Sequence, residues 1–192
     1  MFLSLKRVIC LASLISASVI AQEVGKMQET LPSGQIVSGG YGAPFTKMSR
    51  ISDQDAVFTG AKGAWIINHQ YSLGLAAYGL VNNISVPGYN DRLQYGVGGA
   101  NLEYIYPLAT DFSVAGSVLL GGGIVDFKDN TAGADGVYVA EPEIDFMYSV
   151  TKNFKVALNG SYRAVADSNL AGVSNNKLSG FTYGLALNFG SF

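Results

Sequence analysis

Eight segments of this 192-residue chain alternate apolar and polar residues with a period of two. Such alternation is typical of β-strands with two chemically different faces. Strands of soluble proteins usually have about 5 or 6 residues, whereas a tilted strand needs about 9 to 11 to cross a bilayer. The predicted strands, each of 11 to 14 residues, are Gln35–Lys47, Ala56–Ile67, Tyr71–Val81, Leu93–Tyr106, Phe112–Val125, Val137–Val150, Phe154–Ala166 and Leu178–Phe189. They predict an all-β fold, a closed antiparallel up-and-down eight-stranded transmembrane β-barrel, because a closed barrel leaves no unpaired strand edge in lipid.

The connections between these strands alternate in length. The tight turns are Asn68–Gln70, Pro107–Asp111 and Thr151–Asn153, and Met48–Asp55 is expected to be a connection of intermediate length. The long connections, rich in Gly, Asn and Asp, are Asn82–Arg92, Asp126–Gly136 and Asp167–Lys177. Outer-membrane barrels have the same asymmetry, with short periplasmic turns and longer extracellular loops.

The first 21 residues have the layout of a cleaved secretory signal peptide. Lys6 and Arg7 precede an apolar stretch from Val8 to Ile20, followed by Ala21 as a small residue at the cleavage site. An uncleaved signal anchor is the alternative. After cleavage, residues 22–34 are expected to form a short periplasmic segment and residues 35–192 the barrel. Cleavage also removes the only cysteine, Cys10, so the exported chain has no disulfide.

The small and polar face of the predicted strands is too poor in charge to cover the outside of a soluble protein. Charged residues make up 14% of the chain, against about 25% in an average soluble domain. We therefore expect this face to line the lumen of a narrow barrel. The expected lumen charge network is Lys62, Glu103, Glu141, Glu143, Asp145, Lys155 and Arg163.

Two interpretations of these inward charges remain open. They form a salt-bridge network that plugs the lumen, or they line a narrow polar conduit. Eight strands leave an interior just wide enough for side chains, which favours the plug. If Val150 lies opposite Phe154 across the tight turn, Glu141 lies directly opposite Arg163, and we expect an ion pair between them.

Aromatic residues of the predicted strands gather at two levels. Those beside the short turns or the C-terminus are Trp65, Tyr71, Tyr104, Tyr106, Phe112, Phe146, Tyr148, Phe154 and Phe189. Those toward the long loops are Phe45, Phe58, Tyr95, Tyr138, Tyr162, Phe181 and Tyr183. Two aromatic levels around an aliphatic band are typical of side chains at the two interfaces of a bilayer. Packing of these rings in a soluble β core is the alternative.

The whole exported chain resembles the small eight-stranded outer-membrane barrels of the OmpA/OmpX/OmpW type. The terminal residues Leu185–Phe192 look like the sorting signal that the barrel-assembly machinery reads, with Phe189 and Phe192 as its candidate aromatic residues. Phe192 is out of parity with Phe189, so either Phe189 ends the membrane strand or a bulge separates them. Segments Gly39–Gly42, Gly63–His69 and Tyr78–Asn82 are similar to uncharacterised bacterial proteins of this class. The resemblance implies a fold and a location in the Gram-negative cell envelope but no activity.

Few residues suggest chemistry. Some barrels of this class are lipid A-modifying hydrolases with a catalytic histidine, but the only histidine, His69, falls in a predicted periplasmic turn. The glycine runs Gly96–Gly99 and Gly121–Gly123 lack the following helix and Lys-Ser/Thr of a phosphate loop, so close backbone approach or a bulge is the better interpretation. Pro142 lies in the middle of a strand and is expected to mark a bulge. We expect no catalytic residue, cofactor or metal site.

Two functions of different class follow. The first is a non-catalytic outer-membrane protein with a structural or surface-interaction role. The second, which the OmpW-like resemblance would imply, is a porin-like narrow channel or transporter for small or apolar solutes. A lipid-modifying enzyme is a third possibility. The expected partners are outer-membrane lipid and lipopolysaccharide, with the barrel-assembly machinery during biogenesis. The net charge of −2 argues against nucleic acid, and a monomer is expected.

Overall fold

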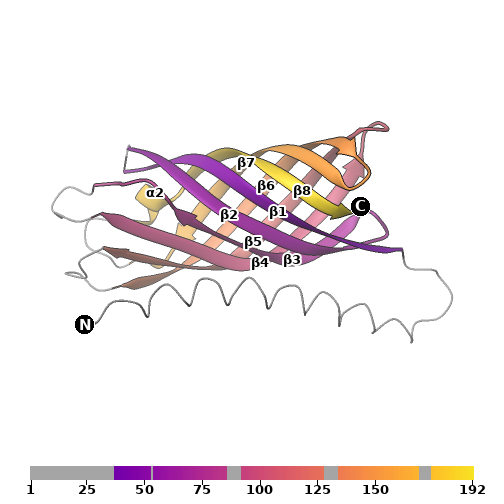
Figure 1. Cartoon of the computed structure of the whole chain (residues 1–192). Helices are drawn as coiled ribbons and strands as arrows, with labels where there is room; N and C mark the ends of the chain where they lie inside the picture. Colours follow the sequence, from indigo (N-terminus) through magenta and orange to yellow (C-terminus); the bar gives the residue numbers. More distant parts are fainter. Residues whose placement is uncertain (1–36, 53, 86–91, 128–133, 169–173) are drawn as a thin grey trace, which may run out of the picture. The chain divides into compact units, whose positions relative to one another are not determined.

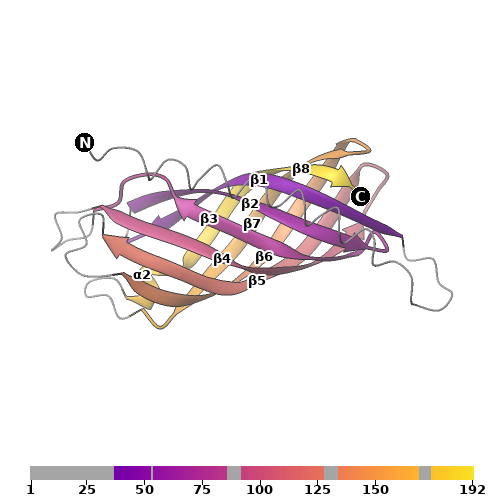
Figure 2. The same cartoon turned by 60° about the horizontal axis from the view of Figure 1, so that its bottom comes forward.

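The computed structural model describes residues 37–52, 54–85, 92–127, 134–168 and 174–192. The predicted signal peptide and the predicted periplasmic segment lie outside the described residues. Eight strands form one closed antiparallel barrel in which each strand pairs with the next and the last pairs with the first (Figures 1 and 2). The strands are β1 (Ser38–Ile51), β2 (Gln54–Ile67), β3 (Tyr71–Leu80), β4 (Leu93–Pro107), β5 (Phe112–Phe127), β6 (Asp135–Thr151), β7 (Phe154–Ala166) and β8 (Gly180–Ser191). The predicted fold class is confirmed.

The prediction of a connection of intermediate length at Met48–Asp55 is wrong. Strand β1 continues to Ile51 and β2 begins at Gln54, so only Ser52, with a φ of 50°, and position 53 separate them. The alternation in fact persists through this segment, since Met48 and Arg50 are exposed while Ser49 and Ile51 are buried. The polar residues Ser49 and Arg50 interrupt the apolar pattern on which the prediction depended.

The β2–β3, β4–β5 and β6–β7 turns lie at one end of the barrel together with the C-terminus, and the longer connections lie at the other end together with the short β1–β2 turn (Figure 1). A short helix, α2 (Asn175–Leu178), lies at the end with the longer connections, within the connection from β7 to β8. One helical turn is too short to show a helical period in the sequence, so α2 was not predicted. Among the described residues, no helix has the length and apolar character needed to span a bilayer.

The predicted pairing of β6 with β7 is right over most of its length. Glu143 lies opposite Ser161 and Asp145 lies opposite Asn159. The register shifts between Ser149 and Thr151, so that Thr151 rather than Val150 lies opposite Phe154. This irregularity is confined to the turn, so the residues of β6 and β7 beyond it keep the inward and outward positions that the alternation predicts.

The bulge expected at Pro142 is absent. Pro142 lies opposite Val118 of β5, and the register between β6 and β7 is the same on both sides of the proline. Its side chain faces outward. A proline removes one donor from the ladder, but here no extra residue is inserted and the strand stays in register.

Close backbone approach accounts for two of the inward-facing glycines. Gly99 of β4 lies directly opposite Gly121 of β5. A Cβ atom built on Gly121 would lie 2.1 Å from the backbone oxygen of Gly98, and one built on Gly99 would lie 2.3 Å from that of Leu120. The two strands therefore pass each other in a geometry that leaves no room for a side chain, as their glycines predicted.

The outer face of the barrel is a belt of exposed apolar side chains. Aromatic rings on neighbouring strands pair across it, with centroids 5.2 Å apart for Tyr71 and Tyr104 and 4.9 Å apart for Phe112 and Tyr148. The predicted interface aromatics, all with exposed side chains, are Trp65, Tyr71, Tyr104, Tyr106, Phe146, Tyr148, Phe181 and Tyr183. The exposed charged residues of the strands, Arg50 and Asp55, pair with each other at the loop end, outside this belt.

Three aromatic residues assigned to the loop-side interface face the lumen instead. Phe45, Phe58 and Tyr95 are buried inside the barrel. Phe58 shares the inward face of β2 with Lys62, and Tyr95 shares the inward face of β4 with Glu103. Assignment by residue type therefore gave the wrong face, whereas strand parity gives the right one.

Candidate functional site

The lumen contains a buried network of ion pairs and hydrogen bonds near its middle. We call this the lumen network; its members are Tyr41, Lys47, Lys62, Tyr78, Glu103, Glu141, Glu143, Asp145 and Ser161. Alternation along β1, β2, β3, β4, β6 and β7 turns these side chains inward, and barrel closure brings the lysines of β1 and β2 across from the carboxylates of β6. Every member is buried.

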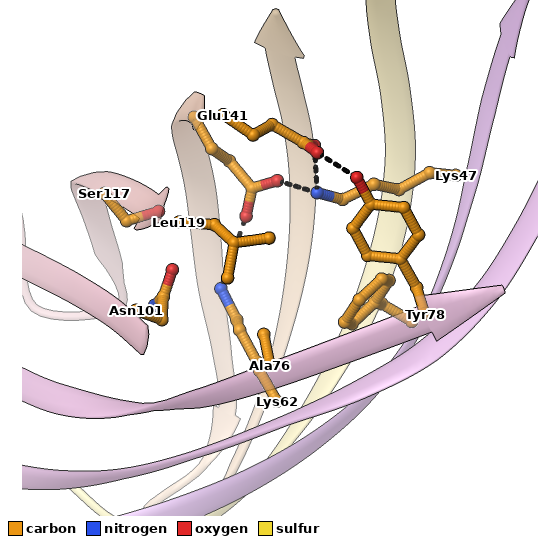
Figure 3. Close-up of a pocket in the computed structure, with 10 residues that line it drawn as sticks. Lys47, Lys62, Ala76, Tyr78, Asn101, Ser117, Leu119 and Glu141 are labelled. Atoms are coloured by element: carbon orange, nitrogen blue, oxygen red, sulfur yellow. Dashed lines mark hydrogen bonds and ion pairs between the residues drawn. The ribbon is translucent and has the colours of Figure 1, made fainter. Parts of the chain in front are cut away.

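Lys47 is at the centre of the network and was missed in the sequence analysis. Its Nζ lies 2.7 Å from Oε1 of Glu141 and also forms an ion pair with Glu143 (Figure 3). Lys47 stood at the predicted end of the first strand, next to a presumed connection. The alternation of Phe45, Lys47 and Ser49 on the inward face of β1 is the signal that could have identified it.

Lys62 forms two further ion pairs of the network, with Asp145 and Glu143. Its Nζ lies 3.2 Å from Oδ2 of Asp145 and 3.5 Å from Oε1 of Glu143. Glu143 therefore lies between the two lysines. The sequence analysis placed Lys62, Glu143 and Asp145 in the lumen, and the structure brings all three into contact.

Hydroxyl groups donate hydrogen bonds to two of the carboxylates, those of Glu141 and Glu103. Tyr78 donates a hydrogen bond to Oε2 of Glu141, and Tyr41 donates one to Oε2 of Glu103. Ser161 Oγ donates to Oε1 of Glu141 at 2.7 Å. Hydrogen bonds of this kind offset the desolvation of a buried carboxylate, which is costly when the charge is left uncompensated.

Little free space remains among these side chains. The cavity bordered by Lys47, Lys62, Tyr78, Glu141 and Glu143 has a volume of about 10 Å³ (Figure 3). A cavity needs a volume of about 10–15 Å³ to hold a single water molecule. The space among these side chains therefore holds at most about one water molecule.

The expected ion pair between Glu141 and Arg163 is wrong. The pairs on either side, Ala140 with Ala164 and Glu143 with Ser161, put these residues level with each other. Glu141 nevertheless turns to Lys47, Tyr78 and Ser161. Among the described residues, no carboxylate lies within ion-pair distance of Arg163. Strand register fixes only the Cα positions, and the long side chains are free to extend toward opposite ends of the lumen.

Arg163 instead packs among aromatic rings. Its Cζ lies 4.5 Å from the ring centroid of Phe58 and 5.4 Å from that of Tyr95. Its Nε donates a hydrogen bond of 2.9 Å to the backbone oxygen of Leu178, and Nη2 donates a longer one of 3.4 Å to Ser49 Oγ. Cation–π contacts and a carbonyl acceptor thus take the place of the expected carboxylate.

An apolar cluster closes the lumen at the loop end. We call it the apolar cap; it consists of Ile51, Phe58, Ile84, Leu93, Tyr95, Val125, Phe127 and Leu178, all buried. Leu178 comes from α2, so the β7–β8 connection contributes to the closure. The cap and the lumen network block the lumen at two successive levels.

Lys155 and the terminal aromatic residues lie at the other end. Lys155 is half-buried, and its Nζ lies 4.3 Å from the ring centroid of Phe192. The Phe192 ring also stacks on Tyr41, with centroids 5.7 Å apart. Phe189 is exposed on the outer face, opposite Phe154. The pairing of β8 with β1 keeps one register from Gly184 to Ser191, so no bulge separates Phe189 from Phe192. The two rings lie on opposite faces because the residues are three positions apart.

The remaining candidate residue, His69, lies in the β2–β3 turn. Its φ is 58°, that of Asn68 is 53°, and Gln70 N donates to the backbone oxygen of Ile67 at 3.2 Å. The side chain is exposed. Within the described part of the chain, no three His, Cys, Asp or Glu residues are grouped so as to hold a metal ion.

Comparison with known proteins identifies the fold. No protein-family model and no curated protein sequence matches this chain. The N-terminal β-barrel domain of OprF from Pseudomonas aeruginosa matches with a TM-score of 0.61 and 11% identity, over 81% of this chain and 99% of that one. Neisserial surface protein A (NspA) matches with a TM-score of 0.56 and 12% identity, over 80% and 96%. The outer membrane protein OprG from Pseudomonas aeruginosa matches with a TM-score of 0.53 and 9% identity, over 80% and 95%. With a closed antiparallel barrel, an apolar outer belt and these structural matches, the chain has the fold of the eight-stranded outer-membrane β-barrels.

Proposed function

We propose that this protein is an integral outer-membrane barrel that conducts no solute, performs no catalysis, and acts through its structure and its loop-end surface. The outer belt supports the membrane location, because exposed apolar side chains cover it and its aromatic rings pair near the turns. One of the matched structures is named a surface protein, in keeping with a role at the cell surface.

The filled lumen is the observation that carries the proposal. A conducting barrel needs a continuous polar path, and here the lumen network leaves a cavity of only about 10 Å³. The apolar cap then adds a second obstruction toward the loops. These features count against the alternative of a narrow channel or transporter.

Single-channel recording in planar bilayers tests the closed lumen. We expect no discrete current steps from the purified barrel under an applied voltage. The same preparation must first show a heat-dependent shift in gel mobility, which establishes that folded barrels are present. Reproducible current steps from such a preparation would refute the proposal and favour the channel.

Cell fractionation tests the location. The protein is expected in the outer membrane, with its partners being outer-membrane lipid and lipopolysaccharide and, during biogenesis, the barrel-assembly machinery. We propose a monomer, since the barrel is complete within one chain. Recovery of the folded protein from the soluble periplasm would contradict the location.

The His69→Ala variant tests the absence of catalysis. The His69 side chain is exposed in a short turn, and no described carboxylate pairs with it. The substitution should leave the lipid A profile of the cells unchanged. A lipid A species that depends on the protein and disappears with His69→Ala would revive the enzyme hypothesis.

A further inference from the structure

Two polar side chains border the cavity of the lumen network without being members of the network. Asn101 comes from β4 and Ser117 from β5, and both line this cavity together with Lys62 and Glu143. Figure 3 shows the pair on the side of the cavity away from Lys47. The cavity therefore has a neutral polar wall on β4 and β5 in addition to its charged walls.

Each of these two side chains has a buried polar atom without a hydrogen-bond partner among the described residues. The atoms are Nδ2 of Asn101 and Oγ of Ser117, and Asn101 is only 5% exposed. Ser117 lies between Glu103 and Glu143 in the strand ladder. Tyr41 binds the first of these carboxylates, and the two lysines of the network bind the second. Buried polar groups in folded proteins are paired with protein or with ordered water, so the two atoms call for a partner in the cavity.

We propose that this cavity binds one water molecule, held by Asn101, Ser117 and Lys62. Its volume of about 10 Å³ is close to the smallest that accommodates a single water. Lys62 Nζ has carboxylate oxygens at 3.2 and 3.5 Å, and an ammonium group has three donors, so one N–H remains for the water.

The charges around the cavity select a neutral ligand. Lys47 and Lys62 border it, and their ammonium groups repel a cation. Glu141 and Glu143 also border it, and their carboxylates repel an anion. The volume admits no organic molecule, and an apolar atom would leave the polar groups of the wall unpaired. Water is the small neutral ligand that remains.

The hydrogen-bonding groups at the cavity match both sides of a water molecule. Its oxygen accepts from the Asn101 amide and the Lys62 ammonium group, and its two hydrogens point toward Glu143 and Ser117. Buried waters typically make about three hydrogen bonds, within a range of two to four. The site offers that number without any change of strand register.

The water connects β4 and β5 to the ion pairs at this level. Those ion pairs join β1 and β2 to β6, and Asn101 and Ser117 reach them only through the water. The water thus extends the closed layer of the lumen to the opposite wall. In this role the inference rests on the proposed closed lumen and deepens it, because it makes solvent a fixed part of the obstruction.

Solution NMR of the full exported protein in detergent micelles tests the site. Rotating-frame cross-relaxation, whose sign separates it from proton exchange, should transfer magnetisation from water to the side-chain amide protons of Asn101. Ser117→Val fills the cavity with a methyl group and should abolish the transfer. Ser113→Val is the matched control: Ser113 is also buried on β5 with an unpaired Oγ, but it does not border the cavity. The control should keep the transfer.

A third variant separates water from a neighbouring hydroxyl proton. Ser117→Ala removes the hydroxyl and leaves space, so Asn101 and Lys62 should still hold the water and the transfer should persist. A crystal structure gives an independent measurement. It should show one peak of density within about 2.7–3.2 Å of Asn101 Nδ2 and Lys62 Nζ, in the unaltered protein and in Ser113→Val but not in Ser117→Val. If Ser117→Val fails to fold, Asn101→Leu fills the same cavity from β4, and crystallography provides the comparison.

Four results would overturn the inference. They are no transfer in the unaltered protein, transfer that persists in Ser117→Val, transfer that is lost in Ser117→Ala, or an ion at the position of the density. A direct hydrogen bond from Asn101 to Glu143 that closes the cavity would give the first of these results. Each is distinct from failure of the proposed function, because an open lumen shows current steps in planar bilayers, whereas a failed water site leaves a closed and folded barrel.

Discussion

Arg163 and Leu178 connect the barrel wall to the loop that closes it. The guanidinium Nε of Arg163, on β7, donates a hydrogen bond of 2.9 Å to the backbone oxygen of Leu178, at the end of α2. Both residues are fully buried. The cation therefore holds α2 in the mouth of the barrel, and the Leu178 side chain completes the apolar cap.

Removal of this hydrogen bond should loosen α2 without unfolding the barrel. In Arg163→Met, the Leu178 oxygen loses its charged donor, and an unsatisfied buried acceptor costs about 1–3 kcal/mol. Hydrogen exchange followed by mass spectrometry should show faster exchange in peptides that cover α2, with the strands unchanged. Arg50→Met is the control, because Arg50 is exposed at the same end and its ion pair with Asp55 is on the surface. Unchanged exchange at α2 would show that the hydrogen bond does not hold the helix.

Double-mutant cycles should distinguish the two cations that lie near Glu141. Lys47 contacts Glu141 at 2.7 Å, whereas Arg163 is level with it but forms no ion pair with it. Contacting residues in one network show coupling energies of about 0.5–3 kcal/mol. We expect the coupling of Lys47→Ala with Glu141→Ala to exceed that of Arg163→Ala with Glu141→Ala, measured by urea unfolding in lipid vesicles. Equal or reversed couplings would contradict the assignment of partners.

The two lysines at different levels of the lumen should differ in their effect on stability. Lys47→Ala leaves Glu141 and Glu143 buried without their common ammonium group, and breaking a buried pair costs roughly 3–5 kcal/mol. Lys155 is half-buried and contacts the Phe192 ring, so Lys155→Ala should cost about 1 kcal/mol or less. Urea midpoints measured under one set of conditions provide the comparison. A loss from Lys155→Ala as large as that from Lys47→Ala would show that the lumen network is not the main polar contribution.

Two neighbouring glycines of β5 should differ in how well they tolerate one added methyl group. A Cβ on Gly121 would lie 2.1 Å from the Gly98 oxygen, whereas one on Gly122 would lie 3.5 Å from the Val137 oxygen, an ordinary contact. Gly121→Ala should therefore reduce the heat-shifted, folded fraction in the outer membrane, and Gly122→Ala should not. Normal folding of Gly121→Ala would mean that β4 and β5 can separate there at little cost.

Loss of Phe192 should impair assembly in cells more than the stability of the finished barrel. Its ring packs inside against Tyr41 and Lys155, so it adds little to the lipid-facing surface. Deletion of Phe192 is expected to lower the amount of folded protein in the outer membrane, while refolding into detergent stays efficient. Normal assembly of the truncated chain would transfer the signal to Phe189, which faces outward.

The sequence by itself determined the strands, their order and most of their faces. Period-two alternation from β2 to β8 is local information, because a residue's side of a strand follows from its parity alone. The same parity placed Lys62, Glu103, Glu141, Glu143, Asp145 and Arg163 inside the barrel. It also separated Phe189 from Phe192, although it could not show whether a bulge or a change of face was responsible.

Only the tertiary structure decided which inward groups meet. Lys47 reaches Glu141 and Glu143 because barrel closure brings β1 across from β6, and no pairing of consecutive strands contains that contact. Arg163 turned toward Phe58 and Leu178 because a long side chain can extend either way along the lumen, and the aromatic cap offered a buried surface there. The inward direction of Phe58 and Tyr95 follows from the parity that they share with Lys62 and Glu103. Their packing against each other and around Arg163, in contrast, depended on the closed barrel. Contacts across a closed barrel depend on side-chain length, rotamer and curvature together, and none of these is written in the alternation of a single strand.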